Sequence, residues 1–515
     1  MTKRYTITTP IYYVNGAPHI GHAYTSIAAD VMARWKRLDG YEVFFLTGTD
    51  EHGQKVEQAA LAVGVAPQEF TDRVSADFRD MARAMNISFD DFIRTTEPRH
   101  LDACAALWRR LQDAGHIYLG AYEGWYATRD ESFYGEDELV LRADGVRVAP
   151  TGAPVEWVTE PSYFFRLADW QDRLLAFYDA HPDFIGPQAR RNEVVSFVRQ
   201  GLKDLSISRT SFRWGVPVPG DPDHVMYVWW DALVNYITAV GYPDESSPLW
   251  RFWPADLHLV GKEIVRFHAV FWPAFLMAAD LPLPKRVYSH GWWTIDGEKM
   301  SKSIGNVVDP RALADEFGID AVRYFLLREV PFGGDGDFSR RALISRLNVE
   351  LANDLGNLAQ RTLSQIARNC DGRLPHRGSV TDDDTVLLNQ AEALRRVVRV
   401  LIDRQALHEA LEEIWKVVRA SNSYIDRQAP WALKKTDLER MGSVLRVLVD
   451  VLRQVGTVLQ PFMPDSMARL LDQLGVAPGE RMLSALDAPL PAGLQLPAPE
   501  GIFPRYVEPV VPAVA

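Results

Sequence analysis

Residues 4–22, RYTITTPIYYVNGAPHIGH, together with the stretch that follows them decide the fold of this chain. Residues 4–14 are rich in Thr, Ile and Tyr and predict a strand, and Asn15-Gly16 is a turn dipeptide. Residues 23–38 carry apolar side chains at helical spacing, and residues 41–47 form a second short apolar strand. Strand, helix and strand in succession make a βαβ unit, which builds a parallel sheet with ligand sites at the carboxyl ends of its strands.

Two histidines lie where the predicted helix begins. His19 and His22 are three residues apart, so both imidazoles project from the first turn, beside unpaired backbone N–H groups and the positive end of the helix dipole. Gly21 permits close approach of a ligand, and imidazole donates hydrogen bonds to phosphoryl oxygens. Histidines near a helix start are as often caps or surface residues, so this segment alone leaves both interpretations open.

A second polar segment occurs far along the chain. The turn signal Asp296-Gly297 precedes a loop, residues 298–306, in which Lys299 and Lys302 are three apart. Two ammonium groups neutralise the charge that accumulates on a departing pyrophosphate, and this stabilises the transition state more than the ground state. A lone Lys-x-x-Lys loop is usually solvated surface, so the loop gains meaning only with the histidine segment.

The remaining sequence divides by pattern. Residues 115–223 contain short strand-like pieces rich in Gly, Pro and aromatic residues, which predict a mainly β insertion with some helix. The α/β pattern then resumes with strands at 224–229, 256–260 and 286–289, which we expect to complete the first sheet. From about residue 339 helical stripes dominate and predict a helical bundle, and the tail after about Pro489 is rich in Pro and Ala.

Composition sets broad limits. A hydrophobic fraction of 47% in 515 residues allows large cores and about three or four domains. No apolar run is long enough for a membrane span, no signal-peptide pattern opens the chain, and only two cysteines, Cys104 and Cys370, occur, which together predict a cytoplasmic protein. The formal net charge of -12 argues against a generally cationic coat, although local patches decide nucleic-acid binding.

The joint occurrence of His-Ile-Gly-His after the first strand and Lys-Met-Ser-Lys-Ser after the last resembles the class I aminoacyl-tRNA synthetases. The resemblance implies that the two segments bind ATP, accompanied by Mg2+, while an amino-acid carboxylate attacks the α-phosphorus. The aminoacyl group then passes to the terminal adenosine of tRNA. Such chemistry depends on positioning and electrostatics and needs no protein nucleophile. By resemblance, His19, His22, Lys299, Lys302 and Arg209 are catalytic, and Gly21, Gly261, Glu263, Met300, Ser301 and Ser303 contact ATP.

Further segments resemble the methionyl-tRNA synthetases along the whole chain: residues 11–16, 48–53, 227–236 and 261–268. The resemblance implies that Asp50 pairs with the substrate ammonium. Aromatic rings suit a polarizable thioether, with contacts worth ~0.3–1.5 kcal/mol each, and Tyr13 or His268 is expected to donate to its sulfur. Isolated aromatic residues more often fill a core, but the predicted sheet edge favours a pocket. The expected wall comprises Ile11, Tyr13, Trp229, Ala232, Leu233, Tyr236, Ile264 and His268.

The insertion departs from the pattern of many members, which carry a zinc knuckle. The ligand places hold Ala127, Asp130, Val148 and Thr151. Tetrahedral structural zinc needs four thiolate or imidazole donors, and this set offers at most one carboxylate. We therefore predict no structural zinc, and expect Trp125, Tyr126, Phe133, Tyr134 and Trp157 to hold the insertion by packing.

In the helical region, Asn357, Arg361 and Trp431 match residues that read the CAU anticodon in the family. An exposed ring stacks on a base, and polar side chains bond to base edges, as in recognition of single-stranded loops. Trp431 as a domain-closing core aromatic is the alternative. The chain ends after this bundle, without the dimerising domain of some longer members, so we predict a monomer that binds L-methionine, ATP and tRNA(Met) and no membrane.

The predicted fold is thus α/β, a Rossmann-like parallel-sheet catalytic domain with a mixed β-rich insertion, followed by a C-terminal α-helical bundle. We divide it into the first catalytic half (1–114), the insertion (115–223), the second catalytic half (224–290), the lysine loop with a stem-contact region (291–340), and an anticodon-binding domain with tail (341–515).

The sequence disfavours three rival functions. A small nucleotidyltransferase also uses a His-x-Gly-His turn, but leaves the insertion, lysine loop and bundle without a role. A catalytically silent tRNA-binding paralogue is disfavoured because both ATP segments are intact. Synthetases for Leu, Ile or Val usually carry a large editing insertion, and cysteinyl enzymes bring zinc ligands that this chain lacks.

Overall fold

The computed structural model describes residues 3–130, 132–142, 144–295, 297–299 and 307–508. Its centre is a seven-stranded sheet in the order β10-β16-β15-β1-β3-β2, with β4 paired to β3. All of these ladders are parallel, as the βαβ pattern predicts. The strands are β1 (Arg4–Thr8), β2 (Tyr12–Tyr13), β3 (Glu42–Asp50), β4 (Asp91–Arg94), β10 (Ile185–Gly186), β15 (Leu257–Gly261) and β16 (Val287–His290).

The N-terminal segment meets the sheet twice. The strand expected over residues 4–14 is interrupted near Pro10, which has no N–H for a ladder. β1 pairs with the first half of β3, whereas β2 pairs with its end, with Tyr13 opposite Asp50. Helix α1 (Ile20–Leu38) follows, and its buried face includes Ile27, Val31 and Trp35. The chain therefore brings residues 11–22 to the carboxyl ends of the central strands.

The insertion is built on a long hairpin of β5 (Ile117–Ala127) and β9 (Glu156–Phe165). Two expectations require correction. The segment 224–229 does not join the central sheet, since β14 (Asp221–Met226) pairs with β12 (Ser208–Arg209) and β13 (Pro217–Val218), and α7 (Val228–Thr238) already includes Trp229. Conversely, β10 lies inside the expected insertion but extends the central sheet beside β16. β14 pairs with strands that are near it in sequence, whereas β10 pairs across about 100 residues.

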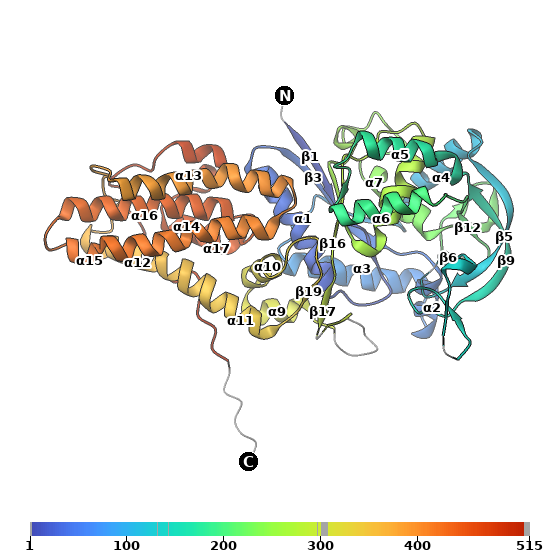
Figure 1. Cartoon of the computed structure of the whole chain (residues 1–515), viewed down its shortest axis with the longest axis horizontal. Helices are drawn as coiled ribbons and strands as arrows, with labels where there is room; N and C mark the ends of the chain where they lie inside the picture. The colour runs from blue at the N-terminus through green and yellow to red at the C-terminus, as the bar shows by residue number, and fades with distance from the viewer. Residues whose placement is uncertain (1–2, 131, 143, 296, 300–306, 509–515) are drawn as a thin grey trace, which may run out of the picture.

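The C-terminal bundle and the insertion lie at opposite ends of the molecule, with the central sheet between them (Figure 1). A nearly continuous helical segment of α11 (Arg340–Arg346), η6 (Leu347–Gly356) and α12 (Asn357–Asn369) leads into the bundle. Its other helices are α13 (Asp382–Asp403), α14 (Leu407–Gln428), α15 (Pro430–Leu433), α16 (Leu438–Leu459) and α17 (Pro464–Gln473). Among the described residues, no helix has both the length and the apolar composition needed to cross a bilayer.

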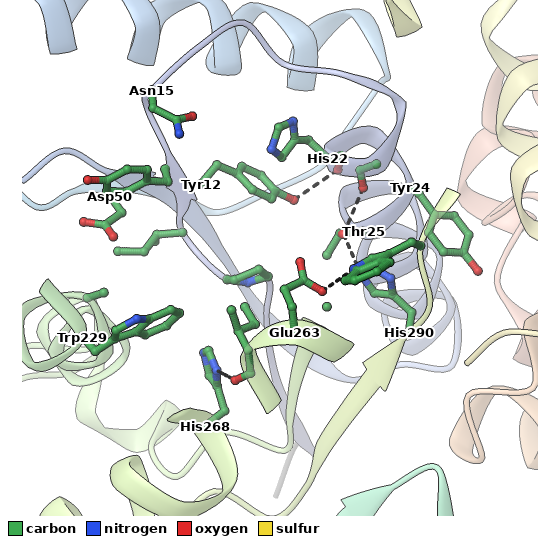
Figure 2. Close-up of a pocket in the computed structure, with 18 of the residues that line it drawn as sticks. Tyr12, Asn15, His22, Tyr24, Thr25, Asp50, Trp229, Glu263, His268 and His290 are labelled. Carbon is green, nitrogen blue, oxygen red and sulfur yellow. Dashed lines mark hydrogen bonds between the residues drawn. The ribbon is translucent and has the colours of Figure 1, made fainter. Parts of the chain in front are cut away.

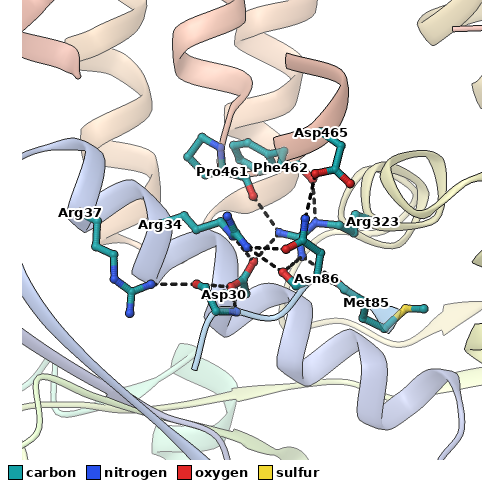
Figure 3. A network of polar contacts seen from close by, with 10 residues as sticks. Asp30, Arg34, Arg37, Met85, Asn86, Arg323, Pro461, Phe462 and Asp465 are labelled. Carbon is teal, nitrogen blue, oxygen red and sulfur yellow. Dashed lines mark hydrogen bonds and ion pairs between the residues drawn. The ribbon is translucent and has the colours of Figure 1, made fainter. Parts of the chain in front are cut away.

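A buried polar contact joins the bundle to the α/β domain. The side chain of Arg323, on α10 (Ile319–Arg328), is fully buried. Its guanidinium lies 2.6 Å from the carboxylate of Asp30 on α1 and donates to the carbonyl oxygens of Pro461 (2.8 Å) and Phe462 (3.0 Å). Arg34 also pairs with Asp30 at 2.7 Å (Figure 3). The guanidinium of Arg323 lowers the pKa of the Asp30 carboxyl despite its burial. We call Asp30, Arg34, Arg323 and the two carbonyls the interdomain clamp.

Candidate active site

A cavity of about 500 Å³ opens at the carboxyl ends of the central strands. Figure 2 shows Asp50, Trp229 and His268 around one part of it, and His22, Glu263 and His290 around the other. Most of the site residues expected from the sequence contribute to its lining: Ile11, Tyr13, His19, Gly21, His22, Asp50, Trp229, Ala232, Leu233, Tyr236, Gly261, Glu263, Ile264 and His268.

His19 and His22 form a capping box at the N-terminus of α1. The Nδ1 atom of His19 accepts from the N–H of Gly21 at 3.1 Å, and the Nδ1 of His22 accepts from the N–H of His19 at 3.1 Å. Each ring therefore carries its proton on Nε2, and the ring centroids are 3.9 Å apart. Because a Cβ on Gly21 would lie 2.9 Å from a carbon of the His19 ring, glycine is needed for this cap. The capping and phosphate-binding interpretations are thus compatible.

One face of α7 forms the opposite wall. Trp229, Ala232, Leu233 and Tyr236 follow the helical spacing i, i+3, i+4, i+7 and line the cavity together with Ile264 and His268. We call these six residues the aromatic wall. Trp229 is stacked on Phe267 with centroids 3.7 Å apart and planes within 4°. One face of the indole is therefore held before any ligand arrives.

Histidine 268 is fixed in a single neutral form. Its Nδ1 lies 2.9 Å from the carbonyl oxygen of Ile264, which only accepts, so Nδ1 carries the proton. Its Nε2 lies 2.7 Å from the Tyr236 hydroxyl, which must then donate. Burial lowers the pKa of His268 from 6.5 to about 4. The expectation that His268 donates to a thioether sulfur requires correction. In this structure Nδ1 already donates to the Ile264 carbonyl, and Nε2 accepts from the Tyr236 hydroxyl.

Asp50, one of the acidic residues that line the cavity, stands at the end of β3. Asp50 is the last residue of this strand, only 7% exposed, and Tyr13 is its neighbour across the ladder. The cation of Lys55 lies 5.5 Å from the Tyr13 ring centre. A carboxylate placed beside aromatic and apolar walls suits the ammonium group of an amino acid.

The turn after β15 forms the third side of the cavity. A Cβ on Gly261 would lie 2.6 Å from the Glu263 carboxylate, so glycine lets that carboxylate fold back over the chain. The Trp292 indole donates to Glu263 at 2.7 Å, while Lys262 pairs with Asp335 at 2.6 Å. These contacts fix the direction of Glu263 into the cavity.

The other residues expected in the active site are Lys299, Met300, Ser301, Lys302, Ser303 and Arg209. Met300, Ser301, Lys302 and Ser303 lie outside the described residues, and of Lys299 only the backbone is described, in β18 (Glu298–Lys299). Arg209 is buried in the insertion: it donates to the carbonyl oxygen of Ser208 at 2.6 Å, and its guanidinium carbon lies 4.5 Å from the Tyr227 ring centre. This placement gives Arg209 a packing role in the present conformation.

Other cavity residues were not anticipated. Thr25 stands one turn beyond His22 on α1, and its hydroxyl lies 2.7 Å from the Nε2 of His290, which ends β16. Both positions follow simple rules, one helical turn and one strand end, that were available in the sequence. Phe267, which supports the cavity by stacking on Trp229, begins a π-helical turn (Phe267–Phe271), so the 3.6-residue spacing does not reveal it. Asn15 and Asp130 also line the cavity.

The four zinc-ligand places of the insertion do not fit a metal. Ala127 and Val148 are buried, and Ala127 belongs to a small apolar cluster with Ala149 and Ala153. The Asp130 carboxylate accepts from the hydroxyls of Tyr134 (2.9 Å) and Thr151. Packing and hydrogen bonds occupy these places, and the single carboxylate is already engaged.

The three residues expected to contact tRNA lie together on the bundle. The guanidinium carbon of Arg361 lies 5.2 Å from the Trp431 ring centre, and Arg361 pairs with Asp426 at 2.5 Å. Asn357 is exposed and precedes Arg361 by one turn of α12. Trp431 is 39% exposed, which excludes a core role. We call Asn357, Arg361 and Trp431 the bundle face.

Comparisons with known proteins agree with this geometry. A family model described as tRNA synthetases class I (M) matches residues 5–363, and one described as the anticodon binding domain of methionyl tRNA ligase matches residues 374–509. The chain is 57% identical over 507 residues to "Methionine--tRNA ligase" of Brucella suis, covering 98% of each protein, and 56% identical over 516 residues to that of Rickettsia felis, covering 99% of this chain and 100% of the relative.

Solved structures give the same result. Mycobacterium tuberculosis methionyl-tRNA synthetase in complex with methionyl-adenylate aligns with a TM-score of 0.96 at 55% identity, covering 98% of this chain and 100% of that chain. The free state of the same mycobacterial protein aligns with a TM-score of 0.89 at 52% identity, covering 99% of each chain.

Proposed function

The chain belongs to the methionyl-tRNA synthetase family of the class I tRNA synthetases, and from this premise we propose how its cavity works. It activates L-methionine with ATP to methionyl-adenylate and pyrophosphate, then transfers methionine to the 3′ terminal adenosine of tRNA(Met). The observation that carries the proposal is the convergence of the helix-start histidines and the aromatic wall on one cavity.

In the first step Asp50 binds the methionine ammonium and the aromatic wall receives the side chain. Ile11 and Tyr13 close the cavity from β2. The half-buried Trp229 offers a ring to the thioether, a contact worth ~0.3–1.5 kcal/mol. Neutral His268 adds no charge beside the apolar sulfur, so the pocket favours an uncharged side chain at any pH well above 4.

ATP, which enters as its Mg2+ complex, occupies the side of the cavity toward α1. The Nε2–H groups of His19 and His22 donate to phosphate oxygens, and the N-terminus of α1 adds its dipole. Gly261 and Glu263 contact the ribose. The methionine carboxylate attacks the α-phosphorus and pyrophosphate leaves, with Lys299, Met300, Ser301, Lys302 and Ser303 proposed to neutralise and enclose the departing group.

The role of Arg209 in activation is proposed on the family resemblance alone. Its guanidinium donates hydrogen bonds to Ser206 and Ser208 and lies against the rings of Phe133 and Tyr227. Contact with ATP requires the side chain to exchange the two serine contacts for phosphate. An Arg209→Lys variant tests this: a fall in exchange with an unchanged melting temperature supports ATP contact, and a lowered melting temperature with unchanged exchange supports packing alone.

The experiment that tests the whole proposal is exchange between ATP and labelled pyrophosphate with each amino acid in turn. Methionine alone should support rapid exchange, and charging should follow with tRNA(Met). Better exchange with leucine or cysteine would contradict the assignment of the cavity. A nucleotidyltransferase would need its own phosphorylated acceptor, and no amino acid, for exchange, whereas a silent tRNA-binding paralogue would show no exchange with either.

We also propose that the insertion holds no structural zinc. The support is the chemistry of the four ligand places, Ala127, Asp130, Val148 and Thr151, which offer one engaged carboxylate. Stoichiometric zinc by metal analysis of the purified protein would overturn this.

The bundle face is proposed to read the anticodon, with Trp431 stacking on a base and Asn357 and Arg361 bonding to base edges. The division into domains at residues 114, 223, 290 and 340, the monomeric state and the cytoplasmic location stay predictions. Sedimentation of the purified protein checks the monomer.

A further inference from the structure

Behind the aromatic wall lies a buried polar cluster with no part in the mechanism above. Asp231, in the first turn of α7, has no exposed surface. Its Oδ2 lies 2.6 Å from the Nδ1 of His52, and its Oδ1 lies 2.6 Å from the Nε2 of His100. His52 follows β3, two residues after Asp50, and His100 belongs to α4 (Pro98–Asp113). The carboxylate therefore joins three separate elements.

The geometry identifies a hydrogen-bonded bridge and not a metal site. His100, Cys104 and Asp231 bring their potential ligand atoms within 4.8 Å of one another. Ligands of a tetrahedral ion at about 2.0 Å lie about 3.3 Å apart, whereas Asp231 and His100 are separated by 2.6 Å, a charge-assisted hydrogen bond. Burial raises the pKa of the Cys104 thiol well above its usual value, so the thiol stays neutral.

The contacts define the state of each group. A carboxylate only accepts, so His52 donates from Nδ1 and His100 from Nε2. Burial alone would raise the pKa of Asp231, but the two histidines lower it. Asp231 is thus a buried anion: Oδ2 accepts from His52, and Oδ1 accepts from His100, with the Cys104 thiol as a more distant donor at 4.0 Å.

The positions of these groups in the fold connect the cluster to substrate binding. Trp229 and Ala232 flank Asp231 on the same turns of α7 and line the cavity, and Asp50 lies just before His52 at the end of β3. A shift of α7 away from β3 would separate the side-chain pocket from the ammonium site. Site residues must be held within about 0.5 Å of productive geometry by groups behind them.

We propose that Asp231, bonded to His52 and His100, is a positioning residue that sets the distance between the aromatic wall and Asp50 and so determines affinity for methionine. The inference rests on the proposed function, since it assigns the cavity to methionine. It concerns binding of the amino acid, because α7 and the end of β3, which Asp231 joins, carry Trp229 and Asp50, whereas ATP is placed toward α1.

The test is Asp231→Asn in the full chain. The amide keeps the shape but presents N–H toward one of two N–H donors, so one hydrogen bond becomes a repulsion. We expect KM for methionine in the exchange reaction to rise about tenfold, as for one lost charge-assisted hydrogen bond, with KM for ATP and kcat changed less than about threefold. Calorimetric titration with methionine should give the same weakened Kd with full stoichiometry. His100→Gln should act in the same direction.

The matched control is Asp384→Asn in the bundle. Asp384 is also a buried carboxylate that accepts from Tyr424 (2.6 Å), Arg440 (2.6 Å) and the N–H of Thr381 (3.0 Å), but it belongs to α13 of the bundle and does not line the cavity. It should leave KM for methionine unchanged. The proposal fails if Asp231→Asn lowers binding stoichiometry without changing Kd, or raises both KM values equally, or matches the control. If the wild type shows no methionine-dependent exchange, the proposed function fails instead.

Discussion

The aromatic wall and the bundle face use tryptophan in opposite ways. Trp229 is stacked on Phe267 with centroids 3.7 Å apart and presents its edge and remaining face to a cavity. Trp431 is 39% exposed, and the guanidinium carbon of Arg361 lies 5.2 Å from its ring centre. A small substrate binds to surfaces that are already rigid, whereas an RNA loop brings its own stacking partner and fits an open ring.

The backbone shows the same contrast. Four residues of the aromatic wall, Trp229, Ala232, Leu233 and Tyr236, stand on α7, where helical hydrogen bonds fix each position. Trp431 follows Ala429, which adopts φ 44° at the end of α14 and so redirects the chain toward Arg361. A left-handed conformation costs a non-glycine residue about 1–2 kcal/mol. The bundle face therefore depends on a strained turn, and the cavity on regular structure.

The largest expected effect is on stability and concerns the interdomain clamp, which joins the α/β domain that carries the cavity to the helical bundle. Arg323→Met removes the donors to Pro461 and Phe462 and one partner of the buried Asp30. Breaking a buried pair from one side costs about 3–5 kcal/mol, which should appear as a lower free energy of unfolding in urea. Arg427→Met, at an exposed arginine 4.0 Å from Asp383, is the control and should change it by less than about 0.5 kcal/mol. Equal changes in the free energy of unfolding for the two variants would contradict the stabilising role of the clamp.

The second effect belongs to the cavity alone. Asp50→Asn removes the charge proposed to pair with the substrate ammonium, and such pairs contribute about 2–5 kcal/mol. The kcat/KM for methionine-dependent exchange should fall at least about 100-fold. Charging of tRNA should fall by the same ratio because it consumes the adenylate. A variant that retains exchange but loses charging would move Asp50 out of the ammonium site.

The third effect belongs to the bundle face alone. Trp431→Ala removes one stacking platform, worth about 1–3 kcal/mol, so kcat/KM for charging should fall about 10- to 100-fold. Exchange without tRNA should stay within about twofold, because Trp431 does not line the cavity. Arg361→Lys keeps the charge but loses the planar fork and should show a smaller loss in charging. Equal losses in exchange and charging would contradict the separation of the two regions.

The sequence predicted the parts that local rules determine. Strand ends located the histidine turn and residues 47–52 at the sheet edge, the family resemblance supplied Asp50 and the wall residues of α7, and the central parallel sheet followed from βαβ order. The pairing of β14 within the insertion and the place of β10 in the central sheet were missed, because β10 and the partners of β14, β12 and β13, are two-residue strands that carry too little pattern to be recognised. Short strands are assigned by tertiary context.

Within the site, chemistry between distant residues was hardest to predict. Residue types placed His268 in the pocket, but not its tautomer, which depends on the carbonyl of Ile264 and the hydroxyl of Tyr236. The burial of Arg209 among aromatic rings likewise arises from the folding of the insertion over Tyr227. Sequence motifs name the residues of a site, and packing decides which of their atoms are available.

The smallest effect tests how rigidly the cavity excludes charge. In the folded state burial lowers the pKa of His268 to about 4, against 6.5 for an exposed ring, so between these values the unfolded chain binds the extra proton. Stability must therefore fall as pH falls from 6.5 toward 4, and this histidine alone contributes about 1 kcal/mol between pH 6.5 and 5.5. Urea unfolding of wild type and His268→Asn at the two pH values measures the difference.

His376→Asn is the matched control for that measurement, because His376 is exposed and stays in water in both states. The control should keep the pH dependence of the wild type, and His268→Asn should flatten it. If both variants retain the wild-type slope, His268 takes up its proton in the folded protein. The cavity would then admit charge and water as freely as the bundle face, and the contrast between a rigid pocket and an open surface would not hold at this residue.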